Sequence, residues 1–323
     1  MNRHIPVLLN ETLLSLNLAP GKQIVDGTLG DAGHAEKILA AISPHGKLMG
    51  IDADAEAILR AKQFLHKYEG QTIFVRDNFE HLKEIIAREA FGPVDGMLLD
   101  LGWSTPQFEE RRRGFSFQQR DEVLDMRYDT LLQCPHTEED PPLSVDGKPL
   151  YGKCTAAELL HIASEEMLRG FFERYGEEQL SKEIAAAIVE QREGYPIETV
   201  GDLVDIILVV YRKKLRTEKE VPWVGGLHPA TKVFQALRIA VNDELGVVER
   251  VLPDAIDVLA PGGRLSIITF HSLEDRIVKH FFKKEAEKKT IRLVHKKPIT
   301  CSKEEHAANP HARSAKLRTI EKI

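Results

Sequence analysis

Cysteine is scarce in this chain: three residues among 323, at Cys134, Cys154 and Cys301. Three scattered cysteines are too few for the disulfide framework of a secreted domain, so the composition favours a reducing, cytoplasmic setting. Long hydrophobic runs are also absent, because the best candidate, residues 204–211, is too short to span a membrane. The N-terminus has no basic region followed by an uninterrupted apolar segment. We therefore expect neither a secretory signal nor a membrane partner.

The shortage of cysteine also limits metal binding. Cys134, His136 and Cys154 could suggest zinc, but they lack a fourth ligand at finger-like spacing. The stretch from residue 134 to 153 is rich in proline and acidic residues and shows no periodicity, which is typical of an exposed loop. The sequence therefore predicts no metal site.

Positive charge is sparse overall but concentrated at one end. The chain carries a net charge of −6, and its last 48 residues, from 276 to 323, contain 14 Lys or Arg and 5 Asp or Glu, or +9. The rest carries 30 basic and 45 acidic side chains, or −15. A basic segment on an acidic body suits contact with a phosphate backbone. A solvated helix face carrying Lys283, Lys284, Lys288 and Lys289 explains the same pattern, and charge alone leaves both explanations open.

A glycine-rich stretch between residues 23 and 39 organises the chain. Residues 23–25 are predicted to end a short buried strand, and Gly27, Gly30 and Gly33 follow it. Apolar residues then recur at helical spacing. Strand, glycine-rich turn and helix together bring bare backbone up to a nucleotide-like ligand, although an ordinary tight turn between strand and helix gives the same pattern.

Strands and helices alternate after this turn. The predicted strands cover residues 23–25, 47–51, 72–75 and 94–99, with helices at 56–68 and 82–90. This alternation predicts an α/β fold with a parallel sheet. Two strands end in acids, Asp52 and Asp100, which should lie on the same edge of the sheet, where open α/β sheets bind their ligands.

The next convincing strand, residues 264–269, is too far along the chain for an ordinary crossover. We therefore expect a helical domain to be inserted into the sheet domain. The predicted boundaries are 1–110 and 226–323 for the two parts of the sheet domain and 111–225 for the inserted helical domain. The insert should carry helices over residues 156–175, 180–192 and 200–214.

The glycine spacing bears on the ligand. It is G-x-x-G-x-x-G, whereas enzymes that bind nicotinamide dinucleotides carry G-x-G-x-x-G. This spacing suits a ligand without a pyrophosphate, such as S-adenosylmethionine. We expect Asp52 to hold the ribose, Phe79 to pack near the adenine, and Asp100 and Gln107 to face the amino-acid part or the acceptor. Taken alone, Phe79 is better explained by core packing, and His34 by capping or local packing at the start of a helix.

Long motifs along nearly the whole chain resemble one family, the RsmH (MraW) ribosomal RNA methyltransferases. The motifs are H-x-P-V-L-L-N-E at residues 4–11, D-G-T-L-G at 26–30, R-G-F-S-F at 113–117, L-D-M-R at 124–127, Y-G-E-E at 175–178, H-P-A-T-K-x-F-Q-A-L-R-I-x-V-N at 228–242, F-H-S-L-E-D-R-I-V-K at 270–279 and R-S-A-K-L-R at 313–318. The resemblance implies a Rossmann-like class I methyltransferase sheet. It implies an enzyme that transfers a methyl group from S-adenosylmethionine to N4 of a cytosine in the decoding region of 16S ribosomal RNA, within the small subunit.

The resemblance also implies site residues. The family's cofactor contacts fall on Ala32, Gly33, His34, Asp52, Phe79, Asp100 and Gln107. We take Asp100 as the catalytic residue, which accepts an N4 hydrogen of the cytosine and orients the amine. We expect Lys316 and Arg318, in the basic C-terminal segment, to contact the RNA.

Three features depart from the family pattern. Ala32 stands where the family usually has glycine, and a methyl group there should require a negative φ. Trp103 replaces a smaller residue in the loop that precedes Gln107. The stretch 130–153 is longer than the usual connection.

Two other functions remain compatible with the sequence. A nicotinamide-dependent oxidoreductase would use a related sheet, and a non-catalytic ribosome-assembly factor would keep the fold without turnover. Binding of S-adenosylmethionine rather than NAD separates the first from a methyltransferase, and an activity assay separates the second. The sequence leaves the oligomeric state open.

Overall fold

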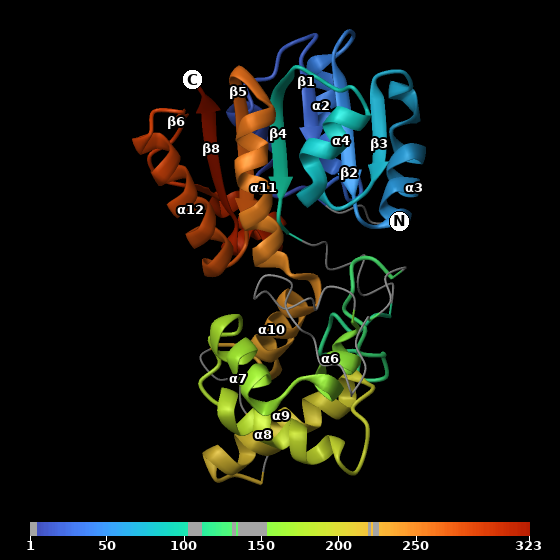
Figure 1. Cartoon of the computed structure of the whole chain (residues 1–323), viewed down its shortest axis with the longest axis vertical. Coiled ribbons are helices and arrows are strands. Elements are labelled where there is room, and N and C mark those ends of the chain that lie inside the picture. Colours follow the sequence, from blue (N-terminus) through green and yellow to red (C-terminus); the bar gives the residue numbers. More distant parts are fainter. Residues whose placement is uncertain (1–4, 103–111, 131–133, 135–153, 219–220, 222–225) are drawn as a thin grey trace. The chain divides into compact units, whose positions relative to one another are not determined.

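The computed structural model of the chain describes residues 5–102, 112–130, 134, 154–218, 221 and 226–323 (Figure 1). The chain divides into two compact units. One comprises residues 1–104 and 245–323, and the other comprises residues 105–244. Within the described part of the chain, no helix is both long enough and apolar enough to cross a membrane.

The first unit is built on one sheet with the strand order β3-β2-β1-β4-β5-β8-β6, and β7 also pairs with β8. Neighbouring strands from β1 to β5 run parallel, whereas β8 is antiparallel to β5, β6 and β7. The strands are β1 (Gln23–Asp26), β2 (Lys47–Asp52), β3 (Thr72–Arg76), β4 (Val94–Asp100), β5 (Leu259–Thr269), β6 (Ile291–Leu293), β7 (Ile299–Thr300) and β8 (Lys316–Lys322). The order reverses between β1 and β4, as doubly wound sheets do, and the predicted Rossmann-like class I methyltransferase sheet is confirmed.

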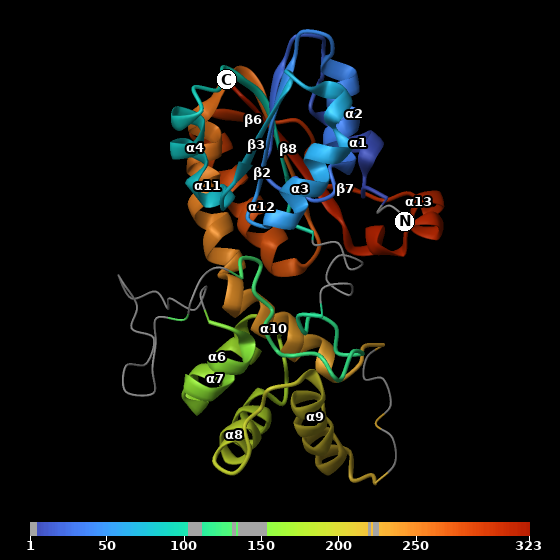
Figure 2. The ribbon, with the colours of Figure 1, turned by 90° about the vertical axis from the view of Figure 1, so that its right-hand side faces the viewer.

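Helices cover both faces of this sheet (Figure 2). One face carries α1 (Leu9–Ser15), α2 (Gly33–Ile42) and α3 (Ala55–Phe64), and the other carries α4 (Leu82–Arg88), α11 (Glu244–Val258) and α12 (Ser272–Glu287). Short elements complete the unit: η1 (His66–Tyr68), η2 (Phe79–His81), α13 (Lys303–Ala308) and η3 (Pro310–Ser314). Because both faces are covered, the central strands are apolar along most of their length, as parallel strands require.

The second unit is helical. It contains α6 (Ala156–Ile162), α7 (Glu165–Arg174), α8 (Ser181–Arg192), α9 (Val200–Leu215) and α10 (Ala230–Asn242). The single helix predicted over residues 156–175 is wrong, because Ala163 leaves the helical conformation and Ser164 caps a new helix. The predicted boundary at residue 225 is also wrong, since α10 packs on α6, α7 and α9 and the unit extends to Glu244.

Two of the sequence motifs meet inside this second unit. Asn242, at the end of α10, donates a hydrogen bond to the carbonyl of Met126 at 2.8 Å and accepts one from the backbone of Tyr128 at 2.8 Å. Arg238 forms a buried ion pair with Glu244 at 2.8 Å. These contacts hold the segment around residues 124–128 against α10, so the motif residues that make them support the fold of the unit.

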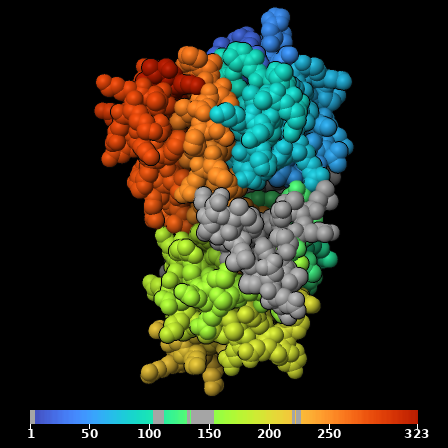
Figure 3. Space-filling model, viewed as in Figure 1, coloured from blue at the N-terminus to red at the C-terminus, as the bar shows by residue number. Residues whose placement is uncertain are grey.

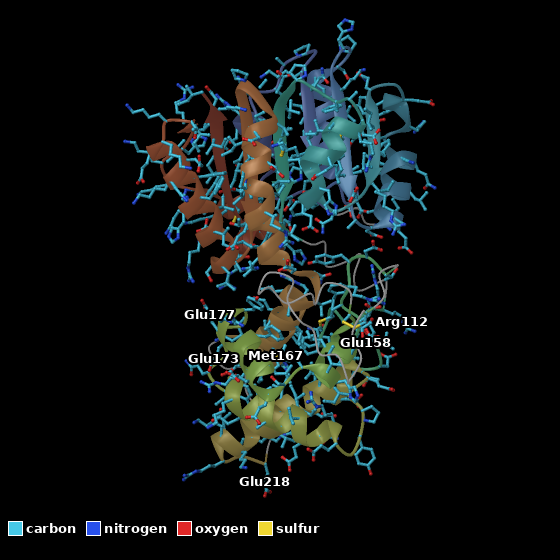
Figure 4. All side chains as sticks on the ribbon, viewed as in Figure 1. Arg112, Glu158, Met167, Glu173, Glu177 and Glu218 are labelled. Atoms are coloured by element: carbon cyan, nitrogen blue, oxygen red, sulfur yellow. A yellow bond between two sulfur atoms is a disulfide. The ribbon has the colours of Figure 1, made fainter. Side chains whose placement is uncertain are left out.

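A disulfide in this unit was not predicted. Cys134 and Cys154 are bonded, with their Cα atoms 4.2 Å apart, and Glu158 of α6 lies beside them (Figure 4). The cysteine count argued only against a disulfide framework, and the spacing of 20 residues along the chain did not show that this one pair is close in space. His136 and the rest of the stretch 135–153 lie outside the described residues.

The C-terminal strand corrects a second expectation. Arg318 Nε of β8 lies 2.7 Å from Asp275 Oδ1 of α12, and Lys316 Nζ lies 3.2 Å from Asp275 Oδ2. The Arg318 and Asp275 side chains are only 14% and 12% exposed. Burial opposes ionisation of Asp275, but the hydrogen bonds and charges of Arg318 and Lys316 outweigh it and hold its pKa below the usual range. Arg318 therefore joins α12 to the sheet and is not free to bind RNA phosphate.

Replacing Arg318 with Ala should lower the free energy of unfolding by about 2–3 kcal/mol, because it leaves a buried carboxylate with only part of its compensating charge. Urea denaturation followed by circular dichroism measures the change. The control Arg292→Ala removes an exposed partner of Glu321 and should cost less than about 1 kcal/mol. Equal losses in the two variants would contradict a structural role for the Asp275 pair.

Candidate active site

Three acidic side chains lie at one edge of the sheet. Asp26, Asp52 and Asp100 end β1, β2 and β4, and these strands are parallel neighbours. The sequence pointed to Asp52 and Asp100 for this reason but missed Asp26, which ends an apolar strand in the same way. Because parallel strands bring their carboxyl ends to one edge, the three carboxyl groups form a single acidic row there.

The glycine-rich turn after β1 shapes the floor of this edge. The Gly27 amide donates to the Leu98 carbonyl at 2.9 Å, and a Cβ on Gly27 would lie 2.5 Å from a methyl carbon of Leu99. Gly30 has φ +50° and donates its amide to Asp52 Oδ2 at 2.8 Å. Side chains are therefore excluded from the turn at Gly27, and the turn is bound to the acid at the end of β2.

Ala32 adopts a conformation that the sequence analysis did not expect. Its φ is +58°, in the left-handed region, and its side chain is fully buried. The expectation of a negative φ is wrong. Alanine in this conformation has a steric cost of roughly 1–2 kcal/mol, because it carries a Cβ. Gly33 follows directly, and a Cβ there would lie 2.5 Å from Pro6 Cγ.

His34 connects the start of α2 with the acidic row. Its Nε2 lies 3.0 Å from the Val7 carbonyl oxygen, and its Nδ1 lies 3.7 Å from Asp100 Oδ2. A carbonyl oxygen only accepts hydrogen bonds, so Nε2 carries a proton and Nδ1 faces Asp100. The side chain is 8% exposed, so His34 both packs locally and contributes to the surroundings of Asp100.

Hydrogen bonds hold both the backbone and the side chain of Asp100. Its own amide donates to Thr28 Oγ1 at 2.7 Å, and its Oδ1 accepts a hydrogen bond from the Gly102 amide at 3.1 Å. A Cβ on Gly102 would collide with the ring of Phe270, just after β5. The side chain of Asp100 is therefore fixed at the point where the chain leaves the sheet.

Burial sets the protonation of this row. It raises the pKa of Asp26 to about 7, against an opposing hydrogen bond from the Thr28 amide and with a smaller contribution from Asp52. Burial likewise raises the pKa of Asp100 to about 7, opposed by the Gly102 amide and assisted by the negative charges of Asp26 and Glu274. A bound cation would favour the ionised forms of both, so the row suits a positively charged ligand.

Phe79 and Asp52 occupy the expected side of the row. Phe79 lies in η2, partly buried, and its Cβ is 3.6 Å from the position that a Gly27 Cβ would take. Asp52 is partly exposed and accepts amide hydrogen bonds from Gly30 and Asp54. An acid able to accept ribose hydroxyls, bare backbone and an aromatic ring therefore lie together, which fits an adenosyl ligand. Gln107, like Trp103, lies outside the described residues.

The chain is similar in sequence to one family of known proteins along nearly its whole length. The model of the MraW methylase family matches residues 1–139 and 148–323, and its gap falls inside the overlong stretch 130–153. A protein of Clostridioides difficile named ribosomal RNA small subunit methyltransferase H is 40% identical over 338 residues, covering 99% of this chain and 99% of its own. Proteins of the same name from Heliobacterium modesticaldum and Symbiobacterium thermophilum are 41% and 42% identical, covering 99% of this chain and 98% and 96% of their own.

Asp26→Asn should flatten the dependence of stability on pH. Because the pKa of Asp26 is raised in the folded protein, its contribution to stability is complete below pH 4 and is lost as the pH rises to about 7. The asparagine keeps an acceptor for the Thr28 amide but does not ionise. Between pH 5 and 8 the wild-type free energy of unfolding should therefore fall by a few kcal/mol more than that of the variant. Parallel curves in urea denaturation at each pH would contradict the burial argument.

Proposed function

The chain belongs to the MraW methylase family, and from this premise we propose that it transfers a methyl group from S-adenosylmethionine to N4 of a cytosine in the decoding region of 16S ribosomal RNA. The relatives named ribosomal RNA small subunit methyltransferase H support the class of RNA. The choice of N4 is supported by the carboxyl of Asp100 at the end of β4, which is 18% exposed and carries the proposal.

The residues of the acidic row fit the methyl donor. The Asp52 carboxylate ends β2 and accepts the Gly30 and Asp54 amides, and an acid at this place in such a sheet accepts ribose hydroxyls. Phe79 offers an apolar surface to the adenine. Ala32 caps α2, and Gly33 and His34 begin it; we assign these three residues to the cofactor contacts. When bound, S-adenosylmethionine supplies an already activated sulfonium methyl group.

Asp100 has the chemistry that an exocyclic amine needs. The cytosine amine is a poor nucleophile because its lone pair is delocalised into the ring. A carboxylate that accepts a hydrogen bond from one N4 hydrogen orients the nitrogen lone pair toward the methyl carbon. Such orientation of the reacting atoms lowers the activation barrier by several kcal/mol. Formation of the N4–carbon bond would break the carbon–sulfur bond of the donor and leave its sulfur as a neutral thioether. Asp100 takes the amine proton, and a pKa of about 7 suits such a base at neutral pH.

The substrate must present a base out of its stack. Sequence-specific proteins reach RNA bases in single-stranded or extruded segments, because the edges in an A-form duplex are hard to read. We propose that the helical unit of residues 105–244 contributes to this recognition, since it is inserted in the chain directly after the Asp100 loop. Ribosomal RNA in the assembling small subunit is the proposed partner, and the cytoplasm is the proposed location.

The two competing functions are less well supported. A nicotinamide enzyme would need the tighter glycine spacing, and the family assignment favours methyl transfer. A non-catalytic assembly factor would not need Asp26 and Asp100 at this edge. Removing their carboxyl groups from water is unfavourable, and a bound cationic ligand compensates for it.

Asp52→Ala should weaken binding of S-adenosylmethionine at least tenfold, because a pair of charge-assisted hydrogen bonds to the ribose contributes about 1.5–3 kcal/mol. Calorimetric titration of the folded variant measures the affinity. The matched control is Asp54→Ala, which removes the cap on the Glu56 amide at the start of α3 and should leave the affinity near that of the wild type. An unchanged affinity in Asp52→Ala would remove Asp52 from the ligand site.

Asp100→Asn tests the proposed chemistry. The amide keeps an oxygen for the N4 hydrogen but takes up no proton, so single-turnover methylation should slow by about 10²-fold or more. Nucleoside mass spectrometry of the RNA should show N4-methylcytidine with the wild type and only a trace with the variant. The affinity for S-adenosylmethionine, measured in parallel, separates a chemical defect from a binding defect. A variant with wild-type turnover would exclude Asp100 as the proton acceptor.

A further inference from the structure

A groove lies between α11 and α12 on the face of the sheet that these helices cover. It has a volume of about 420 Å³ and is lined by Glu249 and Leu252 of α11 and by Arg276, Ile277, His280, Phe281 and Lys284 of α12. All of these residues belong to the first unit. In Figure 3 the surfaces of α11 and α12, orange to red-orange, adjoin on the side turned toward the viewer.

The basic residues of the groove form a row. Arg276, His280 and Lys284 recur every four residues along α12, so they stand on one side of the helix about 6 Å apart along its axis. All three are exposed. Among the described residues, neither His280 nor Lys284 has a carboxylate within 4.0 Å. The row follows one line, as a charged backbone would.

Most acidic side chains near this surface form ion pairs with residues that do not line the groove. Asp275 pairs with Arg318, Glu285 pairs with Lys288, and the Glu321 carboxylate of β8 pairs with two arginines. Glu249 is the one acid lining the groove. Beside the row, Lys279 adds further exposed positive charge on the same helix, whereas Lys283 lies 3.9 Å from the Glu287 carboxylate. The surface is therefore complementary to a polyanion.

The floor of the groove is apolar and aromatic. Ile277 and Phe281 are partly buried, and both pack against the core cluster beneath α11 and α12. The Phe281 ring lies 6.5 Å from the Phe282 ring, which is buried. Part of the Phe281 ring remains accessible beside the row of cations. Cations along a groove with an aromatic ring between them are the usual combination for binding single-stranded RNA, in which phosphates pair with the cations and bases stack on the ring.

The groove starts beside the acidic row. The Leu101 amide, directly after Asp100, donates to the Ile268 carbonyl of β5, and Gly102 packs against Phe270. Two residues after Phe270, α12 begins, and Arg276 lies in its second turn. When the target base of an RNA strand lies at Asp100, the first basic residue of the row beside that strand is Arg276, one to two helical turns from the start of α12.

We propose that the α11–α12 groove binds a single-stranded segment of the substrate RNA that flanks the target nucleotide, with Arg276, His280 and Lys284 on its phosphates and Phe281 stacked on a base. The proposal rests on the proposed function, because it takes RNA as the substrate. It replaces the path over Lys316 and Arg318, whose side chains are bound to Asp275.

The test measures fluorescence anisotropy of a labelled single-stranded oligoribonucleotide with the decoding-region sequence, titrated with the full chain over a series of salt concentrations. The triple variant Arg276→Ala, His280→Ala, Lys284→Ala should bind about tenfold more weakly, and its salt slope should fall by roughly one to two units. Phe281→Leu keeps an apolar side chain but loses the stacking surface, so it should bind roughly fivefold more weakly with an unchanged salt slope.

The matched control removes the same types of charge from the other side of the molecule. Lys47→Ala, Lys62→Ala and His66→Ala are exposed positions in β2, α3 and η1, and this triple variant should bind RNA as the wild type does. A wild-type affinity and slope in the α12 triple variant, or an equal loss in the control, would overturn the groove proposal. Calorimetry with S-adenosylmethionine should give the wild-type affinity for all variants, which shows that the acidic row is intact.

Methyl transfer by the wild type in the same samples separates this proposal from the function on which it rests. If the wild type methylates the RNA and the α12 variant still binds it normally, the groove proposal alone fails. If the wild type transfers no methyl group to small-subunit RNA under conditions where it binds S-adenosylmethionine, the proposed function fails.

Discussion

Burial of carboxyl groups at one edge of the sheet is the constraint on which the site depends. Asp26 is 1% exposed, and it shares this edge with Asp100. A carboxylate in such surroundings is unfavourable without compensation, so both groups hold their protons to about pH 7. Backbone amides of Thr28 and Gly102 supply part of the compensation. A cationic ligand can supply the rest, so the acidic row favours a sulfonium compound over a neutral nucleoside or an anionic nucleotide.

The C-terminal part of the chain adds β8 and α12 to the sheet next to β5. β8 pairs along the length of β5 from Arg264 to Thr269, and Asp275 binds α12 to β8 through Arg318. That contact orients α12 so that its buried side meets the sheet and its basic side faces outward. The helical unit of residues 105–244 separates β4 from β5 in the chain, yet the two strands are neighbours, with Leu101 bonded to Ile268. Recognition elements can therefore be added between the strands without disturbing the acidic row.

The parts of the fold set by local patterns were predictable. Apolar strands that end in Asp52 and Asp100 identified the sheet and its functional edge, because strand periodicity and the ends of parallel strands are readable along the chain. The sequence did not show that Arg318 is mostly buried. A basic residue in a basic segment is expected to be exposed to solvent until its partner on α12 is known. The Cys134–Cys154 bond escaped because it joins residues 20 positions apart, and the left-handed φ of Ala32 escaped because alanine rarely adopts that conformation. Gln107 lies outside the described residues, so its predicted role stays a prediction.

The most direct test of the account is the proton balance of ligand binding. Calorimetric titration of S-adenosylmethionine into the protein at about pH 6.5, in two buffers of different ionisation enthalpy, measures protons released or taken up. Because Asp26 and Asp100 are largely protonated at that pH, the account predicts release of protons as the cationic ligand favours the ionised carboxylates. It also predicts that the release falls in Asp26→Asn. Equal binding enthalpies in the two buffers would contradict the claim that buried acids at the end of β1 and β4 bind the methyl donor.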